Sequence, residues 1–165
     1  MNSRERVLAA INHQEPDRGP FDLGATAASG ISIFTYYDFL ASRNLPTDNV
    51  KAFDIYGLFA YVEKAGADAL GVDTALVPML TPRFGVPINS WKRRKFWDDR
   101  EFWVPEKMVT RVDEDGAEIL MHGGTPVGKM CPGGYHFSEL ANASMGSFDN
   151  LPDELPDPES QVFPE

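Results

Sequence analysis

Three residues in the second half of the chain have side chains that commonly bind metals: His122, Cys131 and His136. Imidazole nitrogens and cysteine thiolates are the ligands that zinc prefers in proteins. Their spacing fits no standard zinc pattern, and the turns expected between them do not place them on one face. We therefore favour a small packed cysteine and two surface histidines, and we predict no metal site within this chain.

Residues 91–97 (WKRRKFW) mix bases with aromatics, a combination found in proteins that bind nucleic acids. Acidic residues at positions 98, 99 and 101 follow at once and neutralise the segment locally. The whole chain has 15 basic and 25 acidic residues, a net charge of −10, which repels phosphate backbones and anionic membranes. We expect a solvated loop here, with no nucleic acid and no membrane as partner.

The composition is that of an ordinary globular protein, with 42% hydrophobic and 24% charged residues among 165. One cysteine cannot form an internal disulfide. The first residues contain no signal-peptide core, and no apolar run approaches the roughly 20 residues of a membrane-spanning helix. We expect a cytoplasmic protein.

The first half of the chain alternates helix and strand signals. Asn2 and Glu5 form the pattern of a capping box at the start of a helix. Helices are also expected over about 31–43, with Ser29 as a possible cap, and over about 62–70, with Gly71 as a left-handed C-cap. Short buried strands are expected at 21–23 and 72–77, whereas 50–59 is ambiguous. This half is predicted to be α/β.

The second half contains no helical stripe between residues 83 and 137. Turn residues at 113–116, 123–124 and 132–134 separate short apolar runs. They predict a small antiparallel β-meander, held together in large part by aromatic pairs across its strands. Residues 149–165 contain four prolines and acidic residues but no base, which is typical of an extended tail.

The opening residues Ser3–Arg18 (SRERVLAAINHQEPDR) resemble the N-terminus of the uroporphyrinogen decarboxylase-like (URO-D-like) superfamily. The resemblance spans nearly the whole chain, and this opening motif is its most specific part. Two later segments resemble the β-rich excursion of one branch, the corrinoid-linked methyltransferase-like proteins. The other matching residues are Pro20, Asp22, Gly24, Leu70–Asp73, Asp113–Gly116 and Lys129–Phe137.

The resemblance implies a TIM (β/α)8 barrel, which needs about 250 residues and cannot fit in this chain. We therefore predict an incomplete α/β fold: the N-terminal part of a barrel with an inserted antiparallel β-meander. Residues 1–82 would hold the N-terminal helix and first βα units, 83–148 the β-rich excursion, and 149–165 the tail. Such a fragment would have unpaired strand edges, and we expect a complementary barrel half or a second copy of the chain to cover them.

The resemblance further implies that the parent protein is a cobalamin- or corrinoid-linked methyltransferase that works with a corrinoid protein. Its zinc, held by histidine and cysteines from later strands, would activate a thiol acceptor. Those positions would lie beyond Glu165, so zinc and a corrinoid are expected in the full-length parent and no cofactor in this chain. We therefore expect the chain alone to be inactive.

Two alternatives stay open. One is a uroporphyrinogen decarboxylase of porphyrin biosynthesis, whose family carries arginines after the first strand and a catalytic aspartate after the second. Here residues 24–30 contain no arginine and residues 77–80 no acid, which disfavours that activity. The other is a non-catalytic binding module that docks through the aromatic meander.

Asp22 is the single candidate catalytic residue. It ends the first expected barrel strand, where the catalytic groups of such barrels commonly lie. A cap or loop hydrogen bond is the more ordinary role for an aspartate in this position. His13, in the residues that end the first helix, is expected to be structural, and no Ser/His/Asp or Cys/His arrangement is evident.

Overall fold

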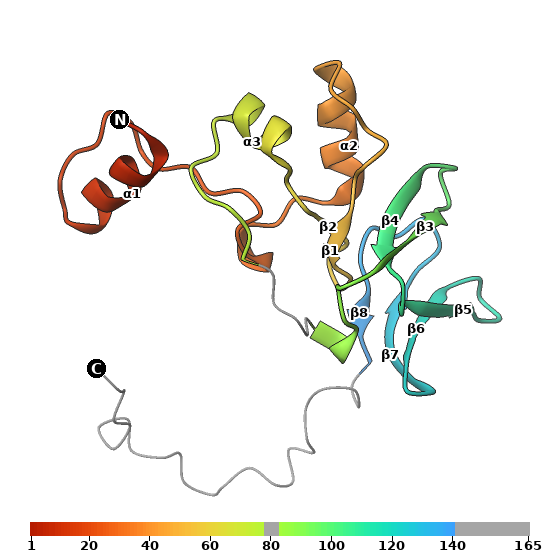
Figure 1. The fold of residues 1–165 in the computed structure, drawn as a ribbon. Helices are drawn as coiled ribbons and strands as arrows, with labels where there is room; N and C mark the ends of the chain where they lie inside the picture. Colours follow the sequence, from red (N-terminus) through yellow and green to blue (C-terminus); the bar gives the residue numbers. More distant parts are fainter. Residues whose placement is uncertain (78–82, 141–165) are drawn as a thin grey trace, which may run out of the picture.

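The computed structural model describes residues 1–77 and 83–140 of the chain. Its helices and strands are short, and the first helix lies apart from the other elements (Figure 1). The α-helices are α1 (Ser3–Ile11), α2 (Ile33–Ser42) and α3 (Lys64–Leu70). The strands are β1 (Ala52–Asp54), β2 (Phe59–Ala60), β3 (Trp91–Lys95), β4 (Glu101–Pro105), β5 (Val109–Val112), β6 (Glu118–His122), β7 (Thr125–Met130) and β8 (Ser138–Glu139).

The ends of the helices follow local signals. The capping box at α1 is confirmed, because the Asn2 side chain accepts from the Glu5 N–H and the Glu5 carboxylate accepts from the Asn2 N–H, both at 2.9 Å. Gly71 ends α3 in the left-handed conformation, with φ of 70°, as predicted. The cap of α2 is Ser32 rather than Ser29.

Antiparallel hairpins make up the β structure. β1 pairs with β2, β3 pairs with β4, and β5 to β8 form one four-stranded sheet in sequence order. The predicted turn at residues 113–116 is confirmed, since β5 and β6 pair on either side of it from Val109↔Met121 to Val112↔Glu118. The turn at residues 123–124 joins β6 to β7. The ambiguous stretch at 50–59 contributes the hairpin of β1 and β2.

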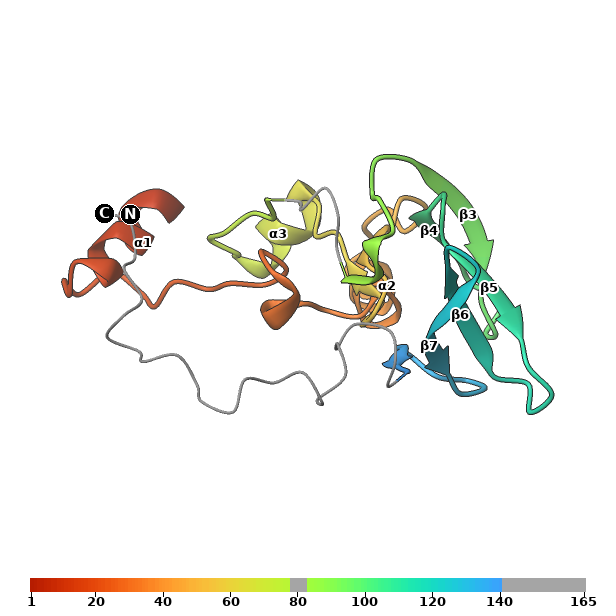
Figure 2. The same ribbon diagram turned by 90° about the horizontal axis from the view of Figure 1, so that it is seen from below.

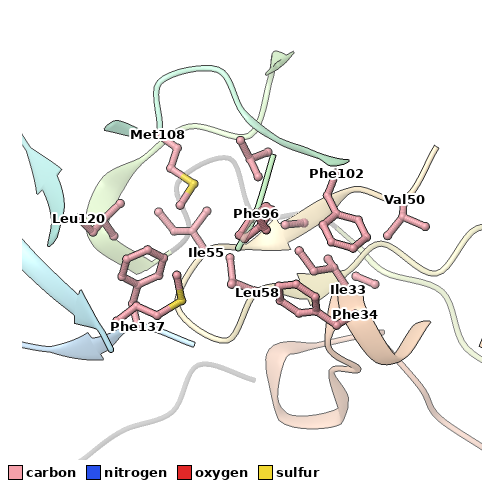
Figure 3. Close-up of a cluster of buried hydrophobic side chains, with 14 of the residues drawn as sticks. Ile33, Phe34, Val50, Ile55, Leu58, Phe96, Phe102, Met108, Leu120 and Phe137 are labelled. Atoms are coloured by element: carbon pink, nitrogen blue, oxygen red, sulfur yellow. The ribbon is translucent and has the colours of Figure 1, made fainter. Parts of the chain in front are cut away.

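One hydrophobic core joins residues from both sides of position 82 (Figure 3). Phe34 of α2 is a buried member of this core, with the rings of Phe102 at 5.2 Å and Phe96 at 5.4 Å in edge-to-face geometry. Four of the aromatic residues from the second half of the chain therefore meet around Phe34 of α2: Phe96, Trp97, Phe102 and Tyr135. This packing holds α2 and β1 against β3 and β4.

The predicted TIM-barrel fragment is wrong. Every pairing between named strands in the described residues is antiparallel, and neither 21–23 nor 72–77 forms a strand. These two segments meet through a backbone hydrogen bond from Asp73 N–H to the Phe21 carbonyl, at 2.8 Å. Parallel strands need cover on both faces, but Phe21 is 42% and Val77 83% exposed.

Candidate functional site

Four charged residues form a network that ties α1 to a distant part of the chain, and we call this network the polar clamp. It consists of Arg6, Asp17, Arg18 and Asp73. Arg6 is buried and donates from Nε to Asp17 Oδ1 at 2.6 Å and from Nη1 to Asp73 Oδ1 at 2.5 Å. Arg18 Nη1 donates to Asp73 Oδ2 at 2.7 Å. The clamp thus holds α1, which Figure 2 shows at the opposite end of the molecule from β3–β7.

Asp73 is the centre of the clamp, and its side chain is fully buried. It also accepts the backbone N–H of Phe21 at 3.0 Å, and this bond, with those from the two arginines, holds the pKa of its carboxyl well below the ordinary value. The hydrogen bond from Arg6 likewise lowers the pKa of Asp17. The reciprocal hydrogen bond from Arg6 to Asp17 raises the pKa of the Arg6 guanidinium. Arg6, Asp17 and Asp73 are therefore charged at neutral pH.

Asp22 lies next to the clamp and is exposed. Its Oδ1 accepts from the hydroxyl of Thr74 at 2.5 Å and from the Ala25 N–H at 3.3 Å. The hydrogen bond from Thr74 is the main cause of a lowered pKa of Asp22, so the group is an ionised acceptor. These contacts give Asp22 a role in joining residues 22–25 to the segment after α3.

The three residues whose side chains could bind a metal, His122, Cys131 and His136, lie in different surroundings. His122 ends β6 beside Gly85, His136 lies with its ring 6.5 Å from that of Tyr56, and Cys131 is exposed. Over residues 1–77 and 83–140, no three His, Cys, Asp or Glu side chains come together as a metal-binding group.

Three of the four bases of β3 have a contact with another part of the molecule, and the fourth, Lys95, pairs with Asp99 just beyond the strand. Lys92 donates to the Met108 carbonyl at 2.6 Å, Arg94 pairs with Glu118, and Arg93 lies over the ring of Trp103 at 5.0 Å. The segment expected to be a solvated loop is therefore a strand whose cations are engaged within the fold.

Trp97 and Tyr135 form an exposed aromatic pair. Their ring centroids lie 5.4 Å apart, and 47% and 51% of the two residues are exposed. The ring of Phe34 packs against both rings, and the Trp97 indole N–H donates to the Gly134 carbonyl at 3.1 Å. The pair is thus fixed in place while its outer faces contact solvent.

Sequence reasoning missed the polar clamp, although all four of its residues lie in the segments that carry the family resemblance. No apolar periodicity marks a charged cluster, and Arg6 and Asp73 are 67 positions apart. One feature of the sequence could have indicated the clamp. Charged residues are concentrated at residues 4–6 (Arg-Glu-Arg) and 16–18 (Pro-Asp-Arg), and the sequence analysis assigned them no partners.

Within the described part of the chain, no helix has the length and apolar character needed to cross a bilayer. Searches with family models, among curated proteins and among solved structures find no match to this chain.

Proposed function

We propose that this chain is the N-terminal portion of a URO-D-like protein whose parent is a corrinoid-linked methyltransferase. In that protein the chain has a structural role: it contributes the clamped α1 unit and an antiparallel β unit. The zinc and corrinoid chemistry belongs to residues outside the chain, and the other partner is a corrinoid protein. The cytoplasmic location expected from the sequence is part of this proposal.

The polar clamp is the observation that supports the proposal. The resemblance rests mainly on Ser3–Arg18 and on Leu70–Asp73, which are far apart in sequence. Arg6, Asp17 and Arg18 come from the first segment, and they meet Asp73 of the second. The clamp therefore gives a physical reason for the charged residues of both segments to occur together. A chance likeness of one short motif would not require this contact.

The direct test is the protein encoded by the genomic sequence that continues from codon 165, produced together with this chain. We expect it to carry histidine and cysteine ligands and to bind zinc. With methylcobalamin and 2-mercaptoethanol it should form the methyl thioether, detected by mass spectrometry. The chain alone is the control and should form none.

Asp73→Asn in that larger protein separates positioning from chemistry. We expect a lower yield of folded protein but an unchanged KM for the thiol, because the clamp lies outside the reacting groups. Decarboxylation of uroporphyrinogen without methyl transfer would favour the alternative enzyme. A continuation without metal ligands, together with no methyl transfer, would refute the methyltransferase proposal.

A non-catalytic binding module is the second candidate, and the exposed pair Trp97–Tyr135 favours it. Aromatic side chains that are held rigid and partly exposed are common anchors of protein interfaces. Size-exclusion chromatography with hydrogen exchange on the isolated chain tests this candidate. A monomer with strongly protected amides in β3–β7 supports a self-sufficient module, whereas aggregation with weak protection supports an incomplete protein.

A further inference from the structure

β5 is an edge strand, because it pairs with β6 on one side and with no strand of the described residues on the other. The hydrogen bond from Asp113 N–H to the Ala117 carbonyl, at 2.9 Å, fixes which residues of β5 bond to β6. Hydrogen-bonded and non-hydrogen-bonded pairs alternate along an antiparallel ladder, so Thr110 and Val112 direct their backbone N–H and C=O groups away from β6. In the described part of the chain, no hydrogen bond reaches these groups.

The side chains of β5 leave this edge open to solvent. Val109 is 55% and Val112 69% exposed, and Arg111 between them is exposed as well. The strand lies at the end of the molecule opposite α1 (Figure 2). An edge with free backbone groups and exposed β-branched side chains can bind a strand of another chain through main-chain hydrogen bonds.

The charges at the two ends of β5 have opposite signs. Lys107, just before the strand, is exposed and forms no ion pair with any described residue. Next to it lies a shallow groove in which Arg93 is the exposed base. The turn after the strand carries Glu114 and Asp115, both exposed. The residues that line the groove are Lys92, Arg93, Arg94, Met108, Val109 and Thr110. An antiparallel second copy would bring its acidic turn to this basic end, so the edge is complementary to itself.

We propose that two copies of this chain associate through their β5 strands, paired antiparallel about a two-fold axis. Thr110 of each copy lies opposite Val112 of the other, and each such pair exchanges two backbone hydrogen bonds. This register uses all of the free backbone groups of the two residues. Continued past the strand ends, it places Lys107 opposite Asp115 of the second copy. The association is isologous, so it ends at a dimer. This inference does not rest on the proposed function.

The same register contains one unfavourable pair, which limits the affinity. Arg111 lies opposite Arg111 of the second copy, and like charges directly across a strand pair are destabilising. Two strands of 4 residues also bury less than the roughly 1,200 Å² of a standard protein interface. We therefore expect a weak dimer, with a Kd on the order of 100 µM.

Sedimentation equilibrium of the full chain, from about 10 µM to about 1 mM in physiological salt, tests the proposal. We expect a reversible equilibrium between monomer and dimer. The amides of Thr110 and Val112 should exchange with deuterium about fourfold more slowly at the higher concentration, whereas the Arg111 amide, which bonds to β6, should change little. A chain that stays monomeric, larger oligomers, or no concentration-dependent protection at Thr110 and Val112 would overturn the proposal.

Exchanging the charges of Lys107 and Asp115 tests the register. Lys107→Glu alone and Asp115→Lys alone should each raise the Kd about two- to tenfold, because each creates a like-charge pair. The two substitutions in one chain should restore the affinity. Lys64→Glu is the matched control, since this lysine of α3 has an 87% exposed side chain and lies outside the edge. Equal weakening in the control, or a double variant that binds no tighter than the single variants, means that the register is wrong.

Two substitutions within β5 separate pairing from folding. Val112→Pro removes an N–H that faces away from β6, so the β5–β6 ladder keeps its hydrogen bonds while the Kd should rise about tenfold or more. Arg111→Thr removes the like-charge pair and should lower the Kd severalfold, a gain that a loss of folding could not produce. Dimerisation that is unaffected by Val112→Pro, or that is not tightened by Arg111→Thr, would rule out the paired edge.

Discussion

Gly66 of α3 contacts the ring of Tyr36 in α2 so closely that a single added methyl group should destabilise the protein. A Cβ at this position would overlap with the Tyr36 hydroxyl oxygen and lie 2.8 Å from Cζ. Tyr36 is 1% exposed, so its ring has little room to move aside. Gly66→Ala is therefore a test of how α3 is positioned against α2.

Two effects of opposite sign decide the outcome. Alanine in place of glycine in a helix interior is worth about 1 kcal/mol in propensity. Overpacking of a rigid core typically costs about 1–3 kcal/mol, and disturbing the hydrogen bond between Tyr36 and the Glu63 backbone costs about 1 kcal/mol more. We expect the clash to prevail, with a net loss of about 1–3 kcal/mol in the free energy of unfolding.

Urea unfolding followed by tryptophan fluorescence measures this loss. Tyr36→Phe removes the overlapping oxygen but leaves Cζ, so the double variant should lose at least about 1 kcal/mol less than the sum of the two single variants. Gly19→Ala is the control, because no atom lies within 4 Å of its added Cβ. A Gly66→Ala protein that is as stable as wild type, or more stable, would refute the packing of α3 on Tyr36.

Three further outcomes follow from single residues. Phe102→Ala should lower the free energy of unfolding by about 3–5 kcal/mol in the same urea assay, because the ring is fully buried among three others; a loss below about 1 kcal/mol would contradict that packing. The lowered pKa values of Asp17 and Asp73 imply that their stabilising effect is complete above about pH 5 and is lost progressively as the pH falls through their ordinary value of 3.8 toward the lowered pKa of the folded state. Thermal unfolding between pH 7 and pH 2 should therefore show a smaller acid-dependent decrease in Tm for Asp73→Asn than for wild type, and parallel curves would contradict the clamp. Gly116→Ala should cost about 1–2 kcal/mol in the urea assay, since residue 116 has φ of +78° in the turn between β5 and β6, and an unchanged midpoint would argue against that turn.

The candidate sites were less predictable than the hairpins. Asp22 was identified as a polar residue at the end of an expected strand, but its partner Thr74 lies 52 positions away, and nothing in the local pattern indicates that contact. Asp54 was not singled out at all, because the stretch around it was ambiguous between helix and strand. Its side chain is buried and accepts the Gly57 N–H at 2.9 Å, and the burial of one carboxylate leaves no mark on the apolar periodicity.

Local interactions were determined by the sequence itself. Three such interactions each involve groups within about four residues: the capping box at Asn2, the left-handed cap at Gly71 and the hairpin turn at residues 113–116. Because the groups are neighbours in the sequence, the residue types alone predict these interactions. Two features depended on the tertiary structure alone. One is whether an apolar run such as 72–77 forms a strand, and the other is the contact between Arg6 and Asp73. A strand exists only when a second segment satisfies its backbone, and a buried charge only when a distant partner neutralises it.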